Sequence, residues 1–129
     1  MERLVNIALW IIAGLLAVAF LAAGMTKLVK NKQALEADPR QAWAHDFSAG
    51  AIKAIGVVEV LGALGLILPA VTGIAVMLVP LAALGLAVTM AGAIIVHLRR
   101  GEKQAVVVPA VLLVMSVVVA WGRFGPYAF

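Results

Sequence analysis

Residues 51–68 read AIKAIGVVEVLGALGLIL, and they place a single carboxylate, Glu59, inside an apolar run. Three more apolar runs, Leu4 to Met25, Ile74 to Val96 and Ala105 to Trp121, share the same 129 residues. A helix needs about 20 mostly apolar residues to cross the hydrocarbon core of a bilayer. A soluble helix needs a polar face, which these runs lack. The sequence therefore predicts an all-α integral membrane bundle of four antiparallel transmembrane helices.

The composition supports a membrane protein with no separate soluble domain. Hydrophobic residues make up 65% of the chain and charged residues 12%, whereas soluble domains have about 45–50% and about 25%. The length leaves room for one bundle, so we expect a single transmembrane domain over residues 1–129. The expected helices are at about 4–26, 51–68, 74–97 and 105–122, with a polar interfacial loop at 27–50.

The basic residues predict how the chain is oriented. Seven of them fall in or beside the first and third connections: Lys27, Lys30, Lys32, Arg40, Arg99, Arg100 and Lys103. The opposite side has only Arg3 and Arg123. The positive-inside rule then places both connections in the cytoplasm and both termini outside a cell (inner or plasma) membrane. The net charge of +4 thus indicates topology and contact with anionic headgroups of the lipid bilayer, and we expect no nucleic-acid partner.

The connections carry proline and aromatic signals. Pro69 to Gly73 is short and uncharged, which predicts that the second and third helices are neighbours. Pro80 falls inside the third run and predicts a bend there. In the polar loop, Trp43 and Phe47 are four residues apart, which suits a short interfacial helix with its aromatic rings turned to lipid. An ordinary loop is the alternative.

Glu59 is the most informative polar residue. A charged carboxylate in the middle of a bilayer costs about 2.5–3.5 kcal/mol on insertion scales, so it must be protonated, paired or open to a wet cavity. Gly56 and Ala63 share its helix face, and small residues mark helix contacts in membranes. We therefore expect Glu59 to point into the bundle. It is either a ligand anchor or proton acceptor, or half of a structural ion pair.

Lys27 is the expected partner of Glu59. Lys53 lies six residues before Glu59, which is about 240° around the helix, so those two side chains cannot pair directly. Lys27 ends the first run on the same side of the membrane as Lys53, and its long side chain can extend inward. Marking topology alone is the alternative role of both lysines.

His97 ends the most polar face of the third run, in line with Thr89 and Ala93. It could relay protons or hydrogen-bond a quinone carbonyl, and a plain interfacial histidine is the alternative. We expect Lys27, Glu59 and His97 to border one hypothetical binding pocket that opens toward the inner leaflet. The alternative is a closed bundle with a structural Lys27–Glu59 pair.

Several chemistries find no support in the sequence. The chain has no cysteine, which excludes thiol-based electron transfer and thiolate metal ligands. Its two histidines, His45 and His97, show no metal-ligand spacing, and His45 is expected to be solvated. We therefore expect no metal site, and no catalytic residue can be assigned.

Short motifs along nearly the whole chain resemble the DoxX-like family. They are Ala23-Gly-Met-Thr-Lys27-Leu, Gly56-Val-Val-Glu59-Val-Leu-Gly62, Leu66-Ile-Leu-Pro69, Thr89-Met-Ala-Gly-Ala93 with His97, and Trp121-Gly-Arg123. The resemblance implies a small four-helix membrane protein of bacterial type with Lys27, Glu59 and His97 at recurring polar positions. Some members are subunits of a thiosulfate:quinone oxidoreductase, and others are linked to membrane-associated oxidative-stress complexes. A quinone- or lipid-binding subunit of a membrane redox system, with a redox partner protein, is what this implies.

Two other classes remain open. Small drug exporters also have four helices in a chain of similar size, but they carry an essential glutamate within the first helix, where this chain has none. The third possibility is an accessory or assembly protein with no site of its own. The oligomeric state and the identity of any ligand do not follow from the sequence.

Overall fold

The computed structural model describes residues 1–129 and contains helices without strands. The long helices are α1 (Glu2–Val29), α3 (Ala49–Thr72), α4 (Leu78–Arg99) and α5 (Val107–Phe124). Three short segments join them: α2 (Lys32–Ala37), η1 (Pro39–Asp46) and η2 (Gln104–Val106). Four helices are long and apolar enough to cross a membrane. The all-α membrane fold is therefore confirmed.

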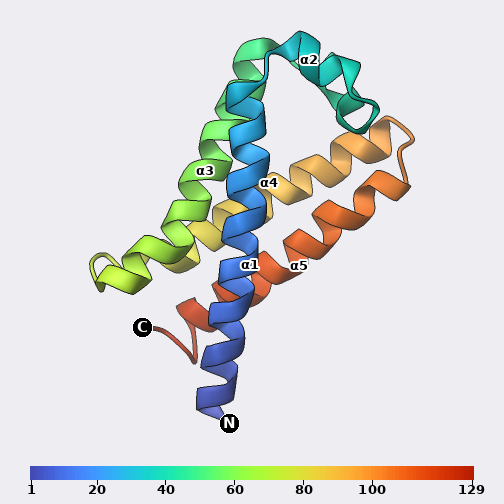
Figure 1. The fold of residues 1–129 in the computed structure, drawn as a ribbon. Coiled ribbons are helices and arrows are strands. Elements are labelled where there is room, and N and C mark those ends of the chain that lie inside the picture. Colours follow the sequence, from blue (N-terminus) through green and yellow to red (C-terminus); the bar gives the residue numbers. More distant parts are fainter.

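The long helices pack as neighbours in the order α1, α3, α4, α5, and α5 returns to α1 (Figure 1). The α2–η1 segment and the connection between α4 and α5 lie at one end, where Arg100 bonds Asp46 at 2.7 Å. The two termini lie toward the opposite end, where Arg123 bonds Asn6 at 2.7 Å. Antiparallel crossing of a bilayer stays a prediction.

The main hydrophobic core fills the half of the bundle nearer the termini. Leu16 and Phe20 of α1, Leu86 of α4 and Val119 of α5 are completely or almost completely buried there. Residues on the outward faces, such as Val18 at 70% exposure, are large and apolar. Such an apolar surface is suited to the hydrocarbon of a bilayer, because lipid tails are as apolar as these side chains. The half nearer α2 is less completely filled and holds the cavity described below.

Two proline predictions differ from the structure. Pro69 lies inside α3, which continues to Thr72 and ends at Gly73 with a left-handed φ of 71°. The second connection is therefore residues 73–77 and not residues 69–73. Pro80 is the third residue of α4, which begins only at Leu78. The first-turn N–H groups of a helix have no intrahelical acceptor, so Pro80 starts the helix and does not bend its interior.

Candidate functional site

Close packing of α1 against α3 positions the two charged residues in the bundle. A Cβ added to Gly56 would lie 3.0 Å from the Cβ of Lys27, so only glycine leaves room for that neighbour. Lys27 stands three residues after Gly24, and Glu59 three residues after Gly56. Residues three apart on a helix share a face. Each charged residue therefore lies on the face of its helix that makes the α1–α3 contact.

Lys27 and Glu59 form a close ion pair, with Nζ and Oε1 2.6 Å apart. The Glu59 side chain is 2% exposed and that of Lys27 14%. This Glu59 oxygen lies against the Lys27 ammonium and has no other partner within the protein. The Lys27 cation thus neutralises the Glu59 carboxylate inside the bundle. The Trp43 ring lies over the Lys27 ammonium, 5.5 Å from it.

Lys53 has a different partner, as its angular position predicts. Its Nζ donates to the carbonyl oxygens of Leu28 at 2.6 Å and Lys30 at 3.1 Å. These carbonyls lie at the C-terminal end of α1, where the helix dipole favours a cation. Lys53 therefore caps α1 and leaves the Lys27–Glu59 pair undisturbed.

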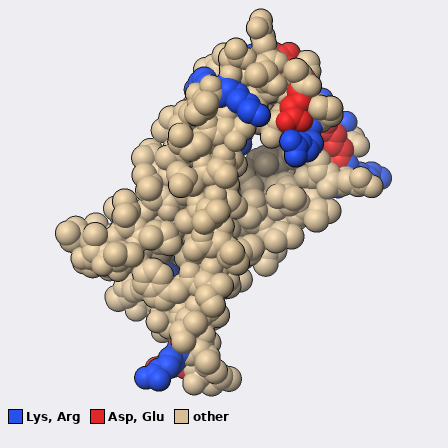
Figure 2. Space-filling view, viewed as in Figure 1, with Lys and Arg blue, Asp and Glu red and all other residues tan.

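A cavity of about 510 Å³ lies beside this pair. Figure 2 shows a hollow on the face between α1, the α2–η1 segment and the α4–α5 pair. Its walls come from α1, η1, α3, α4 and α5 and are mainly apolar. Lys27, Glu59 and His97 all line it, so the structure brings the three residues singled out in the sequence to one cavity. The remaining lining residues are Ala23, Trp43, Phe47, Ile55, Thr89, Met90, Gly92, Ala93, Val96, Val108, Pro109 and Leu112.

Trp43 and Phe47, together called the aromatic cap, close one side of the cavity. The predicted short helix is present as η1, but the prediction that its aromatic rings turn to lipid is wrong. Their rings meet edge to face with centroids 5.7 Å apart, and they pack against a small buried cluster of Leu35, Ala44 and Ile52. The rings therefore face the bundle and not lipid. Folding of the polar loop onto the helices buries apolar groups that a lipid-facing segment would leave outside.

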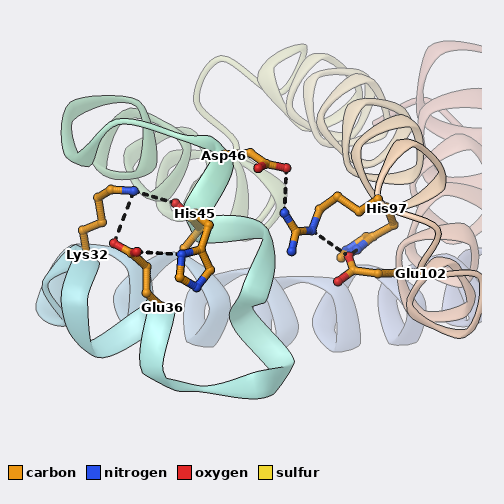
Figure 3. A network of polar contacts seen from close by, with 8 residues as sticks. Lys32, Glu36, His45, Asp46, His97 and Glu102 are labelled. Carbon is orange, nitrogen blue, oxygen red and sulfur yellow. Dashed lines mark hydrogen bonds and ion pairs between the residues drawn. The ribbon is translucent and has the colours of Figure 1, made fainter.

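Ion pairs hold η1 to the connection between α4 and α5 (Figure 3). Asp46 accepts from Arg100 at 2.7 Å, and Arg100 Nε lies 3.3 Å from Glu102. Hydrogen bonding by Asp46 raises the pKa of the Arg100 guanidinium. The Arg100 side chain therefore ties the segment that carries Trp43 and Phe47 to the connection between α4 and α5.

His97 adds a second hydrogen bond to this network. Its Nδ1 lies 2.9 Å from Glu102 Oε1, and donation to that oxygen holds the pKa of the Glu102 carboxyl below its ordinary value of 4.5. With Nδ1 engaged, Nε2 makes no hydrogen bond within the protein. His97 is therefore oriented by Glu102 while it lines the cavity.

Hydrogen bonds and ion pairs also join the two short helices of the polar loop, α2 and η1. Lys32 donates to the carbonyl oxygen of Ala44 at 2.8 Å and lies 3.3 Å from Glu36, which in turn lies 2.7 Å from His45 Nδ1 (Figure 3). His45 is half exposed, so the prediction of a solvated histidine missed its contact with Glu36. These contacts join α2 to η1 and fix the segment that carries the aromatic cap.

Sequence reasoning missed the aromatic cap and Glu102. The spacing of Trp43 and Phe47 was a usable signal, but it did not indicate which way the rings face. Glu102 lies five residues after His97 across a turn, and no helical periodicity relates the two. Only the folded connection brings them together.

Comparisons with known proteins place the chain by family. No curated protein and no solved structure matches it. The family model described as the DoxX-like family matches residues 11–119, which include Lys27, Glu59 and His97. The match covers well over half of the chain and agrees with the four apolar helices. The chain is a multi-pass membrane protein that belongs to the DoxX-like family.

Proposed function

We propose that the cavity binds the polar headgroup of a lipid-soluble molecule, with a quinone as first candidate, and that the protein is a ligand-binding subunit of a membrane redox system. The supporting observation is the buried Lys27–Glu59 ion pair, which borders a mainly apolar cavity. Small-molecule sites typically combine apolar walls with a few convergent polar groups.

The two charged residues suit both oxidation states of a quinone. The Lys27 ammonium can only donate hydrogen bonds, and the ionised Glu59 carboxylate can only accept them. A quinone carbonyl is an acceptor and fits Lys27, whereas a quinol hydroxyl is a donor and fits Glu59. His97 supplies a further ring nitrogen on the same cavity wall. The site thus offers complementary groups at the headgroup before and after reduction.

Replacement of Glu59 by Gln tests the proposal. Gln keeps the size of the side chain but cannot be an ionised acceptor, and a hydrogen bond to a charged group contributes about 1.5–3 kcal/mol. We expect Glu59→Gln to retain its helical circular dichroism. The amount of quinone or lipid that co-purifies with it should be roughly tenfold lower than with the wild type. Mass spectrometry of solvent extracts measures that amount.

Glu2→Gln is the matched control, since Glu2 is an exposed carboxylate at the start of α1, outside the cavity. It should retain as much ligand as the wild type. Equal retention by Glu59→Gln would leave Glu59 a structural role only. Proton flux that depends on added drug in liposomes would favour the exporter alternative, and neither ligand nor flux would favour an accessory protein.

A further inference from the structure

Helices α1 and α5 meet at one end of the bundle and leave room between them at the other. Near the termini, Arg123 bonds Asn6, and Leu9 packs so closely on Gly122 that an added Cβ would lie 2.6 Å from Leu9 Cδ1. Toward the opposite end, Ala23 of α1 and Val108 of α5 both line the cavity. Figure 1 shows the two helices diverging in that direction.

The cavity wall on α5 is continuous with the outer surface of the bundle. Val108 lines the cavity and is 65% exposed. Its neighbours Val107 and Val111 are 61% and 53% exposed, and both are apolar. In a membrane-spanning helix such a surface faces hydrocarbon. The space between α1 and α5 therefore opens onto lipid.

A ligand that entered the cavity from the loop end would have to pass charged and aromatic side chains. The rings of Trp43 and Phe47 cover that side, and the Asp46–Arg100 pair ties the segment that carries them to the end of α4. Movement of a long hydrocarbon chain through charged groups would require their separation and the exposure of apolar surface to water. The route between α1 and α5 carries neither cost.

We propose that the space between α1 and α5 is a lateral portal, and that the hydrocarbon tail of a lipid-soluble ligand stays in the bilayer while its polar headgroup sits beside Lys27 and Glu59. This inference rests on the proposed function and adds the route of entry. The cavity of about 510 Å³ falls within the range that holds a drug-sized molecule. It accommodates a headgroup and the first part of a chain, and the remainder passes Val108 and Leu112 into lipid.

Bulk placed at the portal tests the proposal. Val108→Trp is compared with Val117→Trp, which adds the same side chain to an exposed position of α5 that does not line the cavity and lies nine residues further along the helix. The probes are a long-chain isoprenoid quinone and its tail-less headgroup quinone, titrated against protein in lipid nanodiscs. We expect Val108→Trp to weaken binding of the long-chain quinone by about tenfold, because each methylene displaced from an apolar wall weakens binding severalfold. Binding of the tail-less quinone should stay within about twofold of wild type, and Val117→Trp should leave binding of both probes unchanged.

The outcomes separate the portal from the pocket. Unchanged long-chain binding by Val108→Trp, or equal loss of both probes, would overturn the portal and leave the proposed pocket standing. Failure of the wild type to bind either probe would overturn the pocket itself. Ala23→Leu adds bulk from the opposite rim on α1, and it should reproduce the selective loss of the long-chain quinone. The two rim variants together keep the test valid if one of them fails to fold.

Discussion

Gly24 and Gly56 bring the backbones of α1 and α3 into direct contact. A Cβ on Gly24 would lie 2.8 Å from the carbonyl oxygen of Gly56, and a Cβ on Gly56 would lie 3.0 Å from the carbonyl oxygen of Gly24. Each glycine precedes a charged residue by three positions, so this contact places the Lys27 ammonium 2.6 Å from the Glu59 carboxylate. Helix packing and the candidate site therefore depend on the same pair of residues.

Gly24→Ala should destabilise the bundle and separate the charged pair. The added methyl meets a backbone oxygen, which cannot rotate away, and overpacking of this kind costs about 1–3 kcal/mol. We expect a lower apparent melting temperature in detergent and less co-purified ligand. Gly14→Ala is the control on the same helix, because a Cβ there meets nothing within 4 Å. It should be neutral or slightly stabilising, and equal effects of the two substitutions would contradict the packing argument.

Lys27→Met should destabilise the protein more than removal of both charges. The single substitution leaves Glu59 buried without a counter-charge, and loss of one partner from a buried pair costs about 3–5 kcal/mol. The double variant Lys27→Met with Glu59→Met buries no charge and should recover most of the lost thermal stability. Thermal unfolding of the purified variants, followed by circular dichroism, measures this. Lys103→Met, at an exposed position without an ion pair, is the control. A double variant no more stable than Lys27→Met would argue against a stabilising pair.

Acid should weaken the network that holds η1. Because the pKa of Glu102 is lower in the folded protein than its ordinary value of 4.5, the unfolded chain binds more protons in the window just below that value. The stabilisation by Glu102 is complete above pH 4.5 and is lost as the pH falls through the folded pKa. Glu102→Gln should therefore show a smaller fall in apparent melting temperature between pH 5 and pH 3 than the wild type. Glu2→Gln, at an exposed position at the start of α1, should behave like the wild type.

We predict that both termini face outward and that both charged connections face the cytoplasm. Figure 2 shows the larger group of charged side chains at the end that carries α2 and η1 and a smaller group at the opposite end, and basic residues favour the cytoplasmic side. The chain has no native cysteine, so single cysteines can be introduced cleanly. Lys103→Cys should resist an impermeant maleimide in intact cells, whereas Ala128→Cys should react. The reverse labelling pattern would require the opposite orientation.

The sequence was sufficient for the four apolar helices and for the identity of the charged pair. Apolar runs of bilayer length admit one solution, because a backbone in hydrocarbon must satisfy its own hydrogen bonds. A carboxylate in such a run requires a partner, and the helical rotation between Lys53 and Glu59 left Lys27 as the candidate. These inferences depend on local periodicity and on the cost of burying charge, both of which are readable along one chain.

Only the tertiary structure decided where the loop residues lie. Trp43 and Phe47 turn toward the cavity, and Glu102 reaches His97, because α2 and η1 fold back onto the bundle through contacts such as Asp46 with Arg100. The bond between those two residues joins positions 54 apart in the sequence. No period of 3.6 residues relates such distant groups, and the direction in which an aromatic pair faces depends on what packs against it. Each transmembrane helix follows from the apolar composition of its own segment, which places that segment in hydrocarbon. The aromatic cap and the cavity follow from contacts between segments.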